Sequence, residues 1–86
     1  MNINKLIAIV KNKLEKEIVI QDIKIEDKSF LHKNHKGHQE GKFHLKLMIK
    51  SNELAQSSKI VSTKRIYSVL DLELKEHIHS IQILLN

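Results

Sequence analysis

Hydrophobic residues near the start of the chain recur with the period of an α-helix. The residues that fit the i, i+3, i+4, i+7 pattern are Ile3, Leu6, Ile7, Val10 and Leu14. Lysines and asparagines occupy the remaining positions, so the helix has one apolar side and one polar side. Asn2 or Asn4 can serve as its N-cap. The pattern predicts an amphipathic helix over residues 3–16.

Two later segments alternate with the period of a β-strand. Residues 18–27 are rich in β-branched side chains, and residues 43–50 alternate between Phe, Leu or Ile on one face and mostly polar residues on the other. Between them lies the polar segment 28–41, which holds both glycines of the chain. We therefore predict two strands joined by a long loop and paired antiparallel.

The second half of the chain predicts a short turn, a helix and a strand. Ser51 and Asn52 are typical capping residues, and a short helical turn follows over about residues 53–58. Helical periodicity then predicts a main helix over residues 61–76. The last segment, residues 78–85, alternates but is apolar on both faces, which is typical of a strand inside a sheet or beneath helices.

The predicted order is helix, strand, strand, short helix, helix, strand. Such a chain buries its apolar faces in two layers, a three-stranded sheet with helices on one face. We therefore predict a mixed α/β (α+β) fold. With 86 residues, we expect one domain that spans residues 1–86.

Composition limits the compartment and the chemistry of the chain. It contains no cysteine, so it can build neither a disulfide nor a thiolate ligand by itself. Lysines interrupt the first apolar run too soon for a membrane span. We expect a soluble, cytoplasmic protein with no membrane partner. The formal net charge of +5 favours an acidic partner.

The sequence lacks the common enzyme signatures. Gly37 and Gly41 are its only glycines, and neither belongs to a phosphate-binding loop. A Gly-x-Ser-x-Gly elbow and a His-Glu-x-x-His zinc motif are also missing. We therefore expect no catalytic residue and no enzyme activity.

The segment HKNHKGHQEG, residues 32–41, carries three histidines with a spacing of three. Imidazole is a common metal ligand, so His32, His35 and His38 are candidate metal ligands, one or two of which could converge on a metal. The alternative is a solvated basic loop. For His44 and His79, which fall in predicted strands, we expect side chains with internal hydrogen bonds, His79 on the face of Ile81.

Basic residues gather at the start of the main helix. Lys59, Lys64 and Arg65 could contact phosphates or an acidic partner, because a helix N-terminus also attracts anions. The alternative is an ordinary capped helix.

Several short motifs, taken in order, resemble the BolA-like family. They are Asp27-x-Ser29-x-x-His32, F-H-L at 43–45, Ser51, I-Y-S-V-L at 66–70 and I-H-S-I at 78–81. The resemblance covers nearly the whole chain. It implies a class II KH-like fold, in agreement with the order of elements predicted above.

The resemblance also implies a function. BolA-like proteins pair with monothiol glutaredoxins and share a bridged [2Fe-2S] cluster, in iron–sulfur cluster maturation and iron regulation. Glutaredoxin and glutathione supply thiolates and the BolA-like protein supplies histidine. That division suits a chain without cysteine. Some members bind DNA and regulate transcription through the helix-turn-helix-like region, which corresponds to about residues 52–76.

The chain departs from the family in one place. The family usually has Arg-His-Arg at the start of the main helix, where this chain has Ser62-Thr63-Lys64. A threonine hydroxyl is a poor ligand for a cluster iron. The loop histidines are therefore the expected source of an imidazole ligand, or the chain binds its partner without holding the cluster well.

We interpret the chain as an adaptor that binds a monothiol glutaredoxin and holds a [2Fe-2S] cluster only in that complex. Alone it is expected to be a monomer without a cofactor. The alternatives are a DNA-binding transcriptional regulator and a protein-interaction scaffold without metal.

Overall fold

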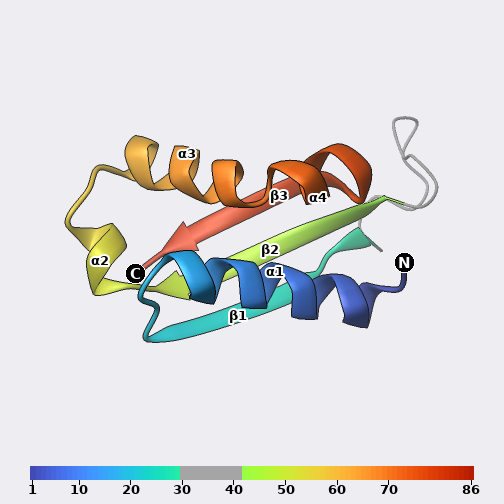
Figure 1. Cartoon of the computed structure of the whole chain (residues 1–86), viewed down its shortest axis with the longest axis horizontal. Helices are drawn as coiled ribbons and strands as arrows, with labels where there is room; N and C mark the ends of the chain where they lie inside the picture. The colour runs from blue at the N-terminus through green and yellow to red at the C-terminus, as the bar shows by residue number, and fades with distance from the viewer. Residues whose placement is uncertain (30–41) are drawn as a thin grey trace.

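The computed structural model describes residues 1–29 and 42–86, which form four helices and three strands (Figure 1). In chain order the elements are α1 (Ile3–Glu17), β1 (Asp22–Asp27), β2 (Phe43–Lys50), α2 (Asn52–Ala55), α3 (Lys59–Val69), α4 (Asp71–Glu76) and β3 (Ile78–Leu85). None of the helices in the described part of the chain has the length and apolarity needed to cross a bilayer.

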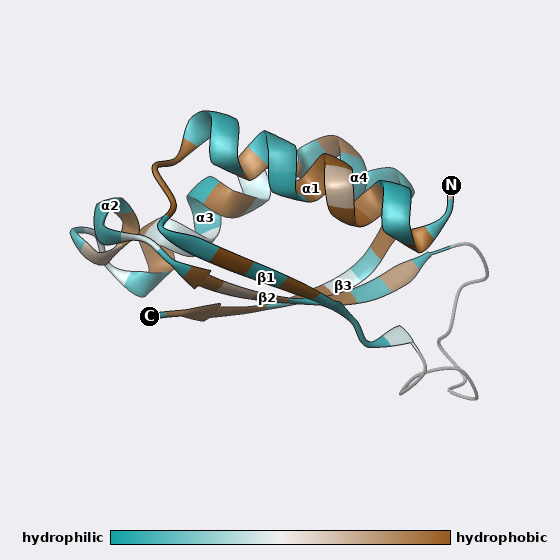
Figure 2. Cartoon of the chain, turned by 90° about the horizontal axis from the view of Figure 1, so that it is seen from below, coloured by the Kyte–Doolittle hydropathy of each residue, from teal (hydrophilic) through white to brown (hydrophobic). Residues whose placement is uncertain are grey.

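The strands form one sheet in the order β1-β2-β3. β1 pairs antiparallel with β2, and β3 pairs parallel with β2. The helices lie on one face of the sheet and leave the other face bare, as Figure 2 shows. The predicted mixed fold, a three-stranded sheet with helices on one face, is therefore confirmed.

The core lies between the helices and the covered face of the sheet. Alternation along β2 places Leu45, Leu47 and Ile49 on that face, and all three are buried. The predicted apolar side of α1 is also confirmed, because Leu6, Val10 and Leu14 are fully buried. Leu54 of α2, Ile66 of α3 and Leu70 between α3 and α4 belong to the same core.

Two details of the sequence prediction were wrong. The helix predicted over residues 61–76 is two helices, because Leu70 has non-helical backbone angles and α4 starts at the next residue. α4 packs on β3. The first strand begins at Asp22 rather than residue 18, because Ile18 caps α1 and is buried in the core. For the last strand, predicted inside a sheet or beneath helices, the second alternative is confirmed, because β3 is an edge strand with helices over one face (Figure 2).

Candidate functional site

The starts of β2 and β3 bring two histidines together. His44 is buried, with 4% of its surface exposed, and its Nδ1 atom lies 2.6 Å from Ser80 Oγ. The centroids of the His44 and His79 rings are 4.7 Å apart, with the rings at 64° in an edge-to-face contact. The expected internal hydrogen bond of His44 is confirmed, and it fixes the ring against which His79 packs.

A β-bulge at the start of β3 determines where His79 lies. Phe43 pairs with Ile78 and His44 pairs with Ser80, so His79 is an extra residue with no opposite partner on β2. His79 is exposed, whereas Ile78 before it is buried. The prediction that His79 lies inward on the face of Ile81 was therefore wrong, because the bulge interrupts strict alternation.

The end of β1 holds the same corner of the sheet in place. The Lys28 N–H donates to His44 O at 2.7 Å, and the His44 N–H donates to Ser29 Oγ at 3.1 Å. The Ser29 N–H in turn donates to Asp27 Oδ1 at 2.9 Å. Hydrogen bonds from the residues after β1 therefore fix the backbone of His44, and the contact with Ser80 of β3 fixes its ring. His79 is presented at the surface from a rigid base.

The described residues fit a metal only as part of a shared site. They include no cluster of three or more His, Cys, Asp or Glu side chains able to hold a metal ion. The chain also has no thiolate, the usual ligand of an iron–sulfur cluster. One exposed imidazole on a fixed base can complete a coordination sphere whose other ligands come from a partner. The predicted ligands His32, His35 and His38 lie outside the described residues.

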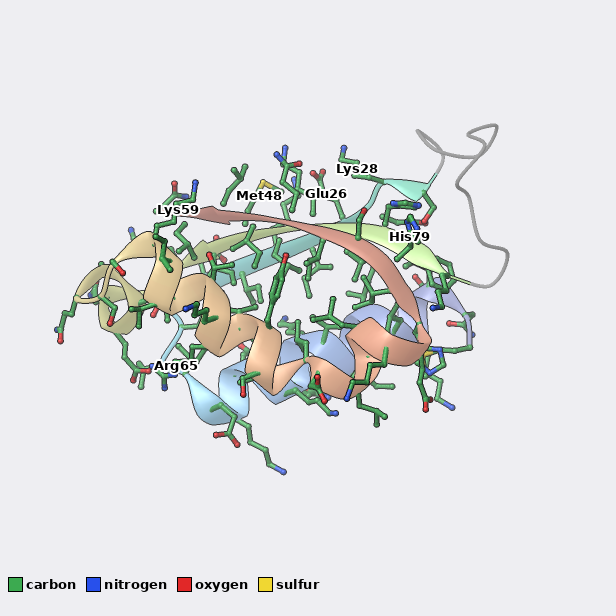
Figure 3. The ribbon with its side chains drawn as sticks, turned by 90° about the horizontal axis from the view of Figure 1, so that it is seen from above. Glu26, Lys28, Met48, Lys59, Arg65 and His79 are labelled. Atoms are coloured by element: carbon green, nitrogen blue, oxygen red, sulfur yellow. The ribbon has the colours of Figure 1, made fainter. Side chains whose placement is uncertain are left out.

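The predicted basic site is divided between two sides of α3. Lys59 and Lys64 are exposed and line one hollow together with Thr63. Arg65 Nη1 instead lies 2.5 Å from Glu53 Oε2, and its Nη2 donates to Glu17 O at 2.8 Å. Figure 3 shows Lys59 and Arg65 on different sides of the helix. Arg65 therefore joins α3 to α1 and α2, and only the two lysines share a surface.

The lysine surface and the histidine pair are far apart. His79 is at the start of β3, whereas Lys59 lines a hollow with Leu84 and Leu85 at the end of that strand. Seven residues of strand span about 20 Å. Figure 3 shows Lys59 and His79 toward opposite ends of β3. Lys59 and His79 therefore belong to separate surfaces of the molecule.

Sequence reasoning missed His79 as a candidate ligand. Its strand neighbours suggested an inward side chain, and only the bulge reveals its exposure. The one signal in the sequence was the I-H-S-I motif at residues 78–81.

Comparison with known proteins decides the family. The sequence model of the family described as BolA-like protein matches residues 14–86. The chain belongs to the BolA-like family. Among curated proteins, no match is found.

Solved structures of BolA proteins share this fold. The BolA domain of SufE1 from Arabidopsis thaliana is 30% identical, with a TM-score of 0.77, over 92% of this chain and 87% of that one. BolA1 from Arabidopsis thaliana is 26% identical, with a TM-score of 0.78 and the same coverages of 92% and 87%. A bol-like protein from Babesia bovis, 17% identical with a TM-score of 0.70 over 91% of this chain and 79% of that one, shows similarity of fold alone.

Proposed function

We propose that this BolA-like chain is an adaptor that binds a monothiol glutaredoxin and shares a [2Fe-2S] cluster with it. It would act in iron–sulfur cluster maturation or iron regulation. The observation that carries the proposal is the exposed His79 ring, packed on a buried His44 that Ser80 fixes. Family membership supports the same role, since BolA-like proteins are generally not enzymes.

His79 is the imidazole ligand in this proposal. The chain has no cysteine, so the thiolates come from the glutaredoxin and from glutathione. His44 orients the His79 ring, much as neighbouring groups orient metal-bound histidines elsewhere. The loop histidines His32, His35 and His38 are the competing source of a ligand.

The test mixes the chain with a glutaredoxin that carries its [2Fe-2S] cluster and follows the visible circular dichroism. We expect a spectrum that differs from the sum of the parts, and a complex on a sizing column. The His79→Ala variant should lose that spectral change. The matched control is His77→Ala, which removes a partly buried histidine from the end of α4.

Each result has a defined meaning. If no complex forms, the adaptor role is wrong. If His79→Ala keeps the spectrum and a variant with His32, His35 and His38 all changed to alanine loses it, the ligand lies in the loop. If both variants keep the spectrum, the chain binds the partner without ligating the cluster.

DNA binding is a second proposal, favoured by one observation. Lys59 and Lys64 are exposed and line the same hollow on α3, and neither forms an ion pair with another described residue. Such cations can contact phosphates and release counterions. Duplex binding should then weaken linearly in log salt, and the slope should fall when both lysines are changed to glutamine. An unchanged slope would remove this function.

A further inference from the structure

The outer edge of β3 has no backbone partner among residues 1–29 and 42–86. The Asn86 N–H donates to Ile49 O at 2.9 Å, so even-numbered residues here turn their backbone groups toward β2. The N–H and C=O groups of Ile81, Ile83 and Leu85 therefore point away from the sheet. They form a row of free donors and acceptors.

This edge lacks the usual protection against pairing. The other edge strand, β1, carries Asp22, Lys24, Glu26 and Asp27. Charges of this kind discourage the addition of a strand. After its bulge β3 contains no formally charged side chain, and it contains no proline. It has the composition of an interior strand at an exposed position, so it is available to pair.

One side of α3 lies along this free edge. Arg65 reaches Glu17 in α1, and Ser68 lines a hollow together with α1 residues, so that side of α3 faces α1. The opposite side, with Lys59 and Tyr67, is turned away from α1, toward the side of the molecule where β3 is the edge (Figures 1 and 3). A strand added to β3 would therefore run beside α3.

Two hollows share Lys59. The first lies between the end of β2, the α2 region and the end of β3, which contributes Leu84 and Leu85, and the second is lined by α3 alone. The α3 hollow is lined by Lys59, Ile60, Thr63, Lys64 and Tyr67. Ile60 and Tyr67 are 69% and 43% exposed, which is high for side chains of this kind.

None of the described residues that line either hollow is acidic. The two lysines on α3 have no ion-pair partner in the described part of the chain. The α3 hollow therefore combines apolar side chains with two lysines, and Lys59 also reaches the hollow at the end of β3.

We infer that the groove between α3 and the outer edge of β3 binds an extended peptide segment of a partner protein. The segment adds to β3 as a fourth strand, and it carries aliphatic side chains and at least one carboxylate. Backbone hydrogen bonds supply affinity, as in other cases of strand addition. The uncompensated Lys59 and Lys64, with the net charge of +5, select the acidic group.

A single strand fits this groove better than a second copy of the chain. A two-fold antiparallel pairing of two β3 strands places both helical layers on the same face of the joined sheet. In Figure 1 α3 runs along this edge, so a second copy would have to fit its own helical layer beside α3. A peptide brings no helical layer to the edge.

The test uses a capped synthetic peptide of alternating valine and glutamate, eight residues long to match β3. Amide hydrogen exchange of the full chain is followed by NMR with and without the peptide. The outward amides of Ile81, Ile83 and Leu85 should exchange about tenfold more slowly when the peptide is bound. The Gln82 and Leu84 amides, which face β2, should not change.

Control variants and a control peptide distinguish recognition by the groove from non-specific peptide binding. Changing both Lys59 and Lys64 to glutamate should weaken binding about tenfold or more. Lys24→Glu, on the opposite edge strand, should leave it unchanged, and a valine–lysine peptide should bind more weakly than the glutamate one. No protection at millimolar peptide overturns the inference. If oligothymidylate protects these amides and the peptide does not, the groove binds nucleic acid and the inference is wrong.

Discussion

Arg65 connects three helices through its guanidinium group, so we assign it a structural role rather than a role in partner binding. Its guanidinium reaches Glu53 in α2 and the Glu17 carbonyl at the end of α1. Arg65→Ala removes a partly exposed ion pair and one hydrogen bond, so we expect a loss of about 1–2 kcal/mol in the free energy of unfolding. Urea denaturation followed by circular dichroism measures it.

The matched control for Arg65 is its neighbour on the same helix. Lys64→Ala removes an exposed cation without an ion pair in the described part of the chain, so its effect on stability should stay within about 0.5 kcal/mol. If Arg65→Ala and Lys64→Ala lower the free energy of unfolding by the same amount, Arg65 does not hold the helices together. Arg65→Ala would then be a fair probe of partner binding.

Sequence spacing at this scale identifies residue types but not their partners. Lys59, Lys64 and Arg65 are close in sequence, yet the helix turns Arg65 toward α1 and leaves the two lysines on another side. His79 alternates with its neighbours in sequence, yet one bulge moves it to the surface. Both outcomes depend on tertiary contacts that no local pattern encodes.

At the scale of elements, the apolar side of α1 accounts for its attachment to the sheet. Leu14 is fully buried beside Leu6 and Val10. Leu14→Ala should lower the free energy of unfolding by about 2–5 kcal/mol, because it loses transfer energy and leaves a cavity. The urea midpoint should fall without a change in slope.

The exposed Lys11 on the same helix provides the control for Leu14. Lys11→Ala keeps helix propensity and removes no core contact, so its midpoint should stay close to that of the parent chain. A small effect of Leu14→Ala would mean that α1 is dispensable for the core.

Periodicity located the elements well and their ends less well. Helical spacing runs through residues 61–76, but the chain leaves helical geometry at Leu70, which is fully buried. Asp71 and Glu73 in the first turn of α4 are typical of a helix start, and they were the available signal. The break coincides with the burial of Leu70 and with contacts between α4 and β3, which are tertiary features.

At the scale of the whole molecule, the two-layer fold follows from the order of elements, but the strand order does not. The two apolar faces of β3 fitted either a strand inside the sheet or a strand beneath helices, and the strand order decides for the second, because β2 is central and pairs with both neighbours. Helices cover one face of β3 only, so they shield the apolar side chains of that face from water (Figure 2). The remaining half stays exposed at the edge, with Leu84 38% exposed.

One ion pair joins distant parts of the chain across the helical layer. Lys13 Nζ in α1 lies 2.6 Å from Glu73 Oε2 in α4, with side-chain exposures of 40% and 6%. The partners differ in their access to water. Lys13→Met leaves a carboxylate buried without its cation, whereas Glu73→Gln leaves an ammonium group that can turn to solvent.

We therefore expect unequal costs for the two changes. Lys13→Met should cost about 3 kcal/mol or more, and Glu73→Gln about 1 kcal/mol, in urea denaturation at neutral pH. The double variant should be more stable than Lys13→Met alone, because it no longer buries an uncompensated charge. Lys16→Met, an exposed position on the same helix, controls for the loss of an ammonium group. If neither single variant costs more than Lys16→Met, Glu73 reaches water without Lys13 and the ion pair does not help to hold α1 against α4.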